Sequence, residues 1–166
     1  MQVIELMSDN CKCYSVELSR KILELFEKYN KEYAYDVESG GILIGKVNQE
    51  TRRIVIEDIT EPYEADKRTR YNFVRSEKGH QEYMDRVWNE SGHELTYIGE
   101  WHTHNQKKIQ ASLIDINNWK RISKIQHNTN VLVFIILGRT DYKVWISNST
   151  KINEFEGKLL LNEEYN

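Results

Sequence analysis

The stretch GEWHTHNQKKIQASLID, residues 99–115, gathers side chains that can bind a metal ion. His102 and His104 stand two positions apart in a chain with five histidines, and Asp115 follows after a polar loop. Side chains at positions i and i+2 of a β-strand point to the same face, so the two imidazoles would project together. Two imidazoles and a carboxylate suit catalytic zinc, which keeps a fourth position for water. The spacing therefore predicts a site with His102, His104 and Asp115 as its ligands.

The elements around this stretch must bring Asp115 back to the histidines. Residues 94–104 have the pattern of a strand, and residues 112–127 that of a helix beginning near Ser112. Side chains three apart on a helix lie on one face, so Ser112 and Asp115 would sit together at its positive end. The loop NQKKIQA between them and the strand can reverse the chain. One strand end and one helix start could thus build the site, with a serine hydroxyl beside it.

Each half of this pattern also has an ordinary structural explanation. S-x-x-D is a common pattern at helix starts, and H-x-H can occur on a strand without binding an ion. The combined spacing is a more specific signal than either half alone. A hydrolytic metal site also needs a general base. The candidates are Glu100, on the strand face of His102, and Glu38, which precedes another strand in DVESGGILIG. Spacing alone does not choose between them.

Length and composition favour one globular domain over residues 1–166, with 39% hydrophobic and 30% charged residues. The net charge of −3 argues against nucleic acid as a partner. No apolar run approaches the ~20 residues of a membrane span, which predicts no membrane partner. The N-terminus lacks a signal-peptide core, so we expect a cytoplasmic protein. Cys11 and Cys13 could chelate metal or be redox-active, but reduced thiols are the expectation in that compartment.

The remaining hydrophobic patterns predict a mixed α/β domain whose sheet is largely antiparallel and flanked by helices. Expected strands are residues 2–6, 41–47, 53–60, 70–75, 131–138 and 142–148. Expected helices, besides 112–127, are residues 15–29 and a segment from an N-cap at Ser76 to about residue 90. The tail from residue 151 has no clear pattern.

Taken together, Glu38, His102, His104, Ser112 and Asp115 resemble the JAMM motif of the JAB/MPN zinc metalloprotease family. The resemblance spans roughly residues 15–147 and matches all five positions. It implies a JAB/MPN-like (cytidine-deaminase-like) α/β fold. It also implies that His102, His104 and Asp115 bind Zn²⁺ and that Ser112 stabilises the tetrahedral oxyanion. Glu38, rather than Glu100, would be the general acid and base.

Three further segments, GHQEY (79–83), SG (91–92) and YIGEWHTH (97–104), resemble the bacterial Mov34/MPN/PAD-1-like subgroup. This subgroup includes the deconjugating peptidases of type II CBASS anti-phage operons, which work beside an E1/E2-like enzyme. The resemblance implies a zinc isopeptidase that cleaves after the C-terminus of a conjugated protein, either a cyclic-oligonucleotide synthase or a ubiquitin-like protein. The alternatives are a peptidase for sulfur-carrier proteins in cofactor biosynthesis and a non-catalytic MPN-type scaffold.

Two features of the sequence bear on this expectation. Asn105 and Ala111 occupy positions where family members usually have proline, so we expect a looser loop around the site. Residues 61–78, including DKRTRYNFVR, could contact an acidic or extended C-terminal tail of the substrate. The same residues would equally suit a solvated loop and an edge strand.

Overall fold

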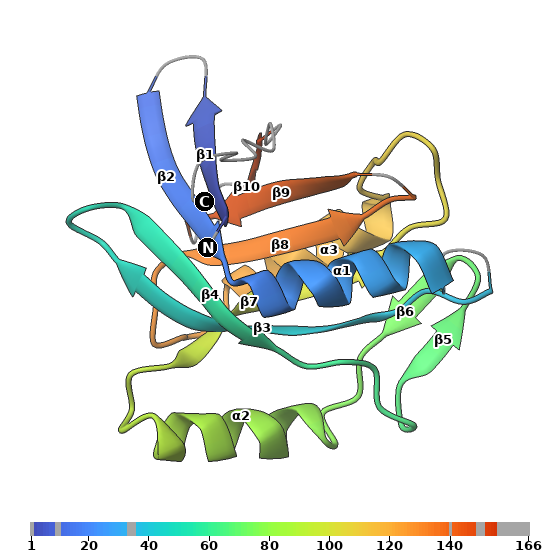
Figure 1. Cartoon of the computed structure of the whole chain (residues 1–166), viewed down its shortest axis with the longest axis horizontal. Helices are drawn as coiled ribbons and strands as arrows, with labels where there is room; N and C mark the ends of the chain where they lie inside the picture. The colour runs from blue at the N-terminus through green and yellow to red at the C-terminus, as the bar shows by residue number, and fades with distance from the viewer. Residues whose placement is uncertain (1, 9–10, 33–35, 140, 149–151, 156–166) are drawn as a thin grey trace, which may run out of the picture.

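A computed structural model describes residues 2–8, 11–32, 36–139, 141–148 and 152–155 of the chain. They form a main sheet of eight strands in the order β1-β2-β4-β3-β7-β8-β9-β10, together with a separate β5–β6 hairpin (Figure 1). The strands are β1 (Gln2–Ser8), β2 (Cys11–Leu18), β3 (Gly40–Asn48), β4 (Arg53–Ile59), β5 (Lys67–Thr69), β6 (Asn72–Val74), β7 (Thr96–Thr103), β8 (Leu132–Leu137), β9 (Tyr142–Ser147) and β10 (Ile152–Phe155). The helices are α1 (Arg20–Glu32), α2 (His80–Glu90) and α3 (Leu113–Ser123).

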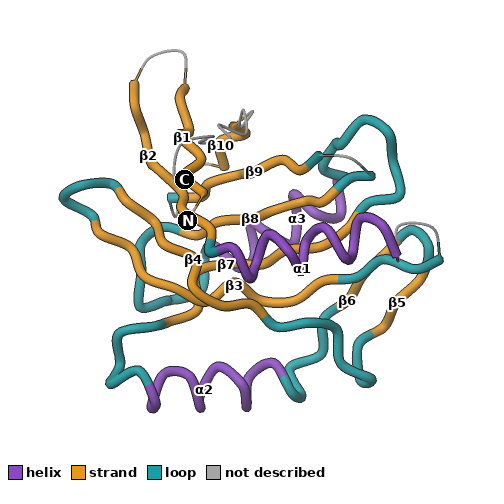
Figure 2. The backbone as a smooth tube through the Cα atoms, viewed as in Figure 1, coloured by secondary structure: helices purple, strands orange, loops and turns teal. Residues whose placement is uncertain are grey.

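The main sheet is largely antiparallel, as the sequence predicted. Two neighbouring pairs, β2 with β4 and β7 with β8, are parallel. The parallel pairing of β7 with β8 is made possible by α3, which crosses between the two strands. The β5–β6 hairpin lies at the end of the sheet where β3 begins and β7 ends (Figure 2).

Helices cover both faces of the sheet, with α1 in front and α3 behind it in Figure 1. On the α1 face, Ile22 and Phe26 pack against alternate residues of β8, including Val133 and Ile135. On the other face, Trp119 of α3 packs against the intervening residues of the same strand. All six residues of β8 are therefore buried, and the apolar run that predicted a buried strand is explained. Within the described residues, no helix is long and apolar enough to cross a bilayer.

The predicted helix over residues 15–29 was wrong at its beginning, because β2 continues to Leu18 and α1 starts at Arg20. Val16 and Leu18 are fully buried strand residues that pair in parallel with β4. Leu18 stands four residues before Ile22. That spacing imitates the helical period and conceals the alternation of the strand.

Two predicted boundaries between residues 67 and 80 were also wrong. The single strand over 70–75 is instead the β5–β6 hairpin, whose turn falls at residues 70–71. Ser76 does not cap a helix, since α2 begins at His80 after Gly79. The amide of Ser76 donates to Asp66 at 2.8 Å and its hydroxyl accepts from the amide of Lys78. Ser76 thus stabilises a turn, which is the other common use of serine near helix starts.

The structure also ends the predicted 112–127 helix earlier, at Ser123, while Ser112 is its N-cap as expected. The side chains of Cys11 and Cys13 lie outside the described residues, although their backbone belongs to β2. The ambiguous tail contains β10, which pairs with β9.

Strand β7, which carries both histidines, contains an irregularity at Gly99. The register of β7 against β3 shifts there, and Gly99 has a φ of 144°. A Cβ atom at this position would lie 1.7 Å from the carbonyl oxygen of Val133 on β8. Only glycine allows the backbones of β7 and β8 to approach so closely.

We therefore predict that Gly99→Ala lowers the free energy of unfolding by more than about 3 kcal/mol, because the new methyl group must displace backbone. Urea unfolding followed by circular dichroism measures the change. The control is Gly92→Ala, where nothing lies within 4 Å of the new Cβ and the only destabilising effect is backbone strain at a φ of 66°. Equal losses in the two variants would contradict this explanation.

Candidate metal centre

The geometry of the site begins with the antiparallel pairing of β3 and β7, in which Gly40 faces His102. Beyond this pair the two chains stay together. The amide of Ser39 donates to Thr103 Oγ1 at 2.9 Å, and the amide of Thr103 donates to the carbonyl of Ser39 at 2.8 Å. Glu38, the next residue back, is consequently placed next to the end of β7 that carries the histidines.

The three predicted ligands do come together. Nε2 of His102 and Nε2 of His104 are 3.0 Å apart. Nε2 of His102 lies 3.2 Å from Oδ1 of Asp115, and Nε2 of His104 lies 3.3 Å from Oδ2 of the same carboxylate. Ligands about 2.0–2.1 Å from a tetrahedral zinc ion stand about 3.3 Å from one another. The donor types and their spacing therefore fit a metal ion of this kind, and the three residues form a candidate metal cluster.

Asp115 reaches the histidines because the start of α3 is fixed. Ser112 and Asp115 form a reciprocal cap: the amide of Asp115 donates to Ser112 Oγ, and the amide of Ser112 donates to Asp115 Oδ2 at 2.7 Å. One turn further on, Trp119 stacks on Phe134 of β8 with ring centroids 4.9 Å apart. Its ring also lies beside that of His102, at 6.4 Å. The helix is thus anchored to the sheet directly behind the site.

The loop between His104 and Ser112 is held by contacts with the residues that follow β8. Asn105 Oδ1 accepts two hydrogen bonds from the guanidinium of Arg139, at 3.1 Å and 2.9 Å. Ile109 is buried and occupies the space beside Gly138, where a Cβ would lie 2.6 Å from it. These contacts tie both halves of the loop to the turn between β8 and β9. The sequence predicts a looser loop from Asn105 and Ala111, and these contacts are the restraints that the structure shows on it.

The ionisation of the cluster favours a negatively charged Asp115. Burial alone would raise the pKa of this carboxyl, but hydrogen bonds from His102, His104 and Ser112 hold it well below its usual range. Burial lowers the pKa of His104, yet the contact with Asp115 and the nearby charge of Glu38 outweigh it, so that pKa is raised. An anionic oxygen between two imidazoles is a strong attraction for a divalent cation.

Glu38 lies in a different environment, which favours its neutral form. Its side chain is only 6% exposed. Burial raises its pKa to about 7, the positive field of His104 lowers it somewhat, and the charge of Asp115 raises it further. A carboxyl with a pKa near neutrality can both accept and release a proton at physiological pH.

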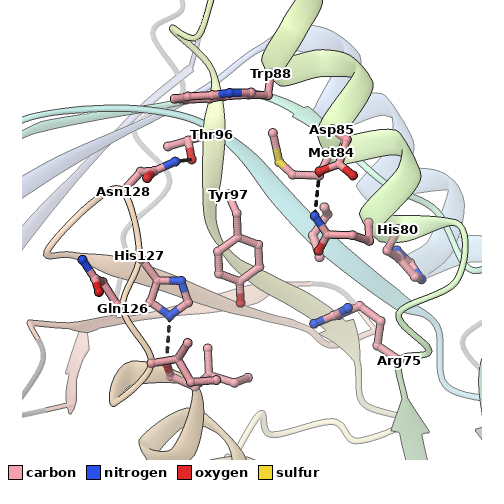
Figure 3. Close-up of a pocket in the computed structure, with 14 residues that line it drawn as sticks. Arg75, His80, Met84, Asp85, Trp88, Thr96, Tyr97, Gln126, His127 and Asn128 are labelled. Atoms are coloured by element: carbon pink, nitrogen blue, oxygen red, sulfur yellow. Dashed lines mark hydrogen bonds between the residues drawn. The ribbon is translucent and has the colours of Figure 1, made fainter.

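Glu100, the other candidate base, is engaged elsewhere. Its Oε1 accepts from Nε and Nη2 of Arg75, at 3.0 Å and 2.8 Å, and from the hydroxyl of Tyr97 at 3.3 Å. Arg75 and Tyr97 line a pocket of about 410 Å³ between α2, β7 and the end of α3. Figure 3 shows Tyr97 in the middle of this pocket, between His127 and Arg75, with Trp88 across one end. None of the three candidate ligands lines it.

Comparison with known proteins agrees with this architecture. The family described as prokaryotic homologs of the JAB domain matches residues 24–152. The chain belongs to the prokaryotic JAB family. A relative from Pseudomonas aeruginosa named CD-NTase/cGAS isopeptidase is 32% identical over 124 residues, 75% of this chain and 77% of that protein. A relative of the same name from Escherichia coli is 32% identical over 143 residues, 86% of each chain.

Two further matches extend the comparison. A Vibrio cholerae relative, also named CD-NTase/cGAS isopeptidase, is 29% identical over 152 residues, 91% of this chain and 92% of that protein. A solved structure from Desulfitobacterium hafniense superimposes with a TM-score of 0.58 over 91% of this chain and 99% of that chain, at 15% identity. The predicted JAB/MPN-like fold is thereby confirmed.

Sequence reasoning missed the residues that hold this JAB domain's site from outside the motif. The most buried of them is His80, whose Nε2 lies 3.0 Å from Asp66 and whose Nδ1 lies 2.6 Å from Thr60 Oγ1. The same hydroxyl accepts from the amide of Ile42 on β3. The chain of contacts joins α2, the β5–β6 hairpin and β3. In the sequence, His80 was noticed only as part of the GHQEY resemblance, and its contacts with Asp66 and Thr60 become apparent only in the folded structure.

We predict that the purified protein binds one zinc ion per chain, because three converging donors have the spacing of a tetrahedral site. Elemental analysis after gel filtration gives the stoichiometry. The zinc content of His104→Ala and Asp115→Asn should fall below about a tenth of the wild-type content, since the first variant loses a ligand and the second the negative charge of a ligand. Glu100→Gln is the matched control and should retain zinc. Full zinc content in Asp115→Asn would contradict the ligand set.

We also predict that, after removal of metal with EDTA, Glu38→Gln is more stable than the wild type at pH 8. The pKa of Glu38 is raised from 4.5 to about 7, so folding favours the protonated form and ionisation destabilises the native state. The destabilisation is fully present above pH 7 and disappears as the pH falls to 4.5. A shift of this size corresponds to roughly 3 kcal/mol. Urea unfolding at pH 5 and pH 8 measures it, and a difference that does not change with pH would refute it.

Proposed function

We propose that this protein is a zinc-dependent isopeptidase that hydrolyses the amide bond after the C-terminus of a conjugated protein. One observation carries the proposal: a buried carboxyl with a pKa near 7, Glu38, stands beside a convergent His102–His104–Asp115 cluster. The three relatives named CD-NTase/cGAS isopeptidase support the same activity. A non-catalytic scaffold would need neither the donor set nor the buried carboxyl.

The chain's own residues supply proton transfer and orientation. Zinc held by His102, His104 and Asp115 would acidify a water molecule and polarise the scissile carbonyl. Glu38 accepts the proton of that water and then delivers it to the leaving amine, for which its raised pKa is suited. The engagement of Glu100 with Arg75 supports Glu38 as the base.

Ser112 is proposed to stabilise the oxyanion that develops on the carbonyl. Its hydroxyl is on an exposed residue and donates to Asp115 Oδ2 at 2.7 Å. A hydroxyl has a single proton. Ser112 must therefore turn its proton from Asp115 to the oxyanion as negative charge builds up. In comparable sites a donor of this kind lowers the activation free energy by about 3 kcal/mol.

The substrate class follows from the relatives' names. We propose that the substrate is a CD-NTase, a cyclic-oligonucleotide synthase, whose C-terminal tail has been joined to another protein by an E1/E2-like enzyme. The reaction would take place in the cytoplasm, and the genes of these proteins would belong to a type II CBASS anti-phage operon. A sulfur-carrier or ubiquitin-like protein is the alternative substrate, with the same chemistry. Both proposals place an extended protein tail at the metal centre.

The test is cleavage of a CD-NTase fused through its C-terminal residue to green fluorescent protein. We predict a single cut at the junction, a loss of at least about 100-fold in kcat for Glu38→Gln with zinc retained, and continued cleavage by Glu100→Gln. Undiminished cleavage by Glu38→Gln, or no cleavage by the zinc-loaded wild type, would refute the proposal. A fusion carrying a sulfur-carrier protein instead of the CD-NTase separates the two substrate classes.

A further inference from the structure

The backbone around Glu38 is held from two sides. From β7, Thr103 makes the two hydrogen bonds with Ser39 described above. From the β5–β6 hairpin, the carbonyl of Thr69 accepts from the amide of Glu38 at 2.7 Å. Glu38 lies two residues before β3 begins, outside the paired register of the main sheet. Its own peptide groups are therefore positioned by the hairpin.

Arg68 makes the side-chain contact of the hairpin with this backbone. Its Nε donates to the carbonyl oxygen of Glu38 at 2.9 Å, and its Nη2 donates to the hydroxyl of Ser39. The planar guanidinium thus bridges two consecutive residues, a geometry that the single ammonium of lysine does not reproduce. Ser39 is fully buried and Arg68 half-buried, so both bonds form where water competes weakly.

The β5–β6 hairpin is itself attached to α2 and to the start of β3, so it can hold the backbone of Glu38 in place. Asp66, directly before β5, accepts from the amide of Ser76, which lies two residues after β6 ends. The other oxygen of Asp66 accepts from the amide of Tyr63 at 2.7 Å, and both oxygens contact the ring of fully buried His80. Across the hairpin from Arg68, Phe73 packs on Gly40 so closely that a Cβ there would lie 2.6 Å from its ring.

We propose that Arg68 is a positioning residue for the reaction: it fixes the backbone of Glu38 so that the carboxyl meets the proton it must transfer. The inference rests on the proposed function. Proton transfer requires a donor–acceptor distance of about 2.6–3.2 Å, and a displacement of about 1 Å costs on the order of 100-fold in rate. Arg68 touches the main chain of the base and the hydroxyl beside it, and thus acts through Glu38.

The first test compares Arg68→Ala and Arg68→Lys with the wild type, using Arg86→Ala as the control. Arg86 lies on α2, outside residues 61–78, is exposed, and has its guanidinium carbon 4.8 Å from the ring centre of Tyr83. In Arg68→Ala we expect kcat to fall by about 10- to 100-fold, KM to change less than about twofold, and zinc content to stay at the wild-type level. Arg68→Lys should recover part of kcat, and Arg86→Ala should match the wild type.

A second test uses Ser39→Ala, which removes only the acceptor of Arg68 Nη2. If the guanidinium acts through this contact, the effects of Arg68→Ala and Ser39→Ala on kcat are not additive, and the double variant is no slower than Arg68→Ala alone. Additive losses would overturn the proposal. A rise in KM with unchanged kcat would also overturn it, because Arg68 would then contact the substrate.

The third test does not depend on activity. In metal-free protein, hydrogen exchange at the amides of Glu38 and Ser39 should accelerate at least about 10-fold in Arg68→Ala and remain at the wild-type rate in Arg86→Ala. Unchanged exchange in Arg68→Ala, or exchange accelerated throughout the sheet, would show that Arg68 does not position Glu38. A wild type that cleaves no fusion would instead refute the proposed function, while the exchange rates still decide whether Arg68 holds this backbone.

Discussion

The pairing of β3 with β7 is the constraint on which the candidate site depends. A one-residue change of register would turn His102 and His104 to the α1 face of the sheet and move Glu38 away from them. The register is fixed by large buried residues, such as Ile42 on one face and Trp101 on the other. It is also fixed by Gly99, because any residue with a Cβ at this position would clash with the backbone of Val133. Core packing therefore decides the geometry of the polar residues at the strand ends.

Burial has opposite consequences for the two carboxyl groups of the site. Asp115 meets imidazoles and a hydroxyl, which hold its charge, whereas for Glu38 the loss of solvent dominates and raises its pKa to about 7. One carboxylate is thus prepared to attract a cation and the other to exchange protons. The distinction arises from hydrogen-bond donors: Asp115 sits at a helix start, where such donors are plentiful.

The sequence was sufficient to predict the residues whose spacing is local. His102, His104, Ser112 and Asp115 belong to one strand end and one helix start, and period-two and capping arguments placed them correctly. Glu38 needed the family resemblance, because its approach depends on a pairing between strands more than fifty residues apart in sequence. The helix boundary at Arg20 was missed since Leu18 fits both periodicities.

The partners of the site could not be predicted for the same physical reason. Arg68 and Arg75 stand in a charged stretch with no periodicity, and a charge reveals nothing about its acceptor until the chain has folded. Arg75 contacts a carboxylate 25 residues away, and Arg68 a backbone carbonyl 30 residues away. Such contacts depend on tertiary structure alone.

The contact of Asn105 with Arg139 has a consequence for the order of folding. A proline restricts a loop already in the unfolded chain, so its effect is present before any tertiary contact forms. Here the restraint joins residues 34 apart in sequence and requires the β8–β9 turn to be in place. The loop that carries Asp115 toward the histidines is therefore restrained by this contact only after the chain around Arg139 has folded, whereas a proline would restrain it from the start.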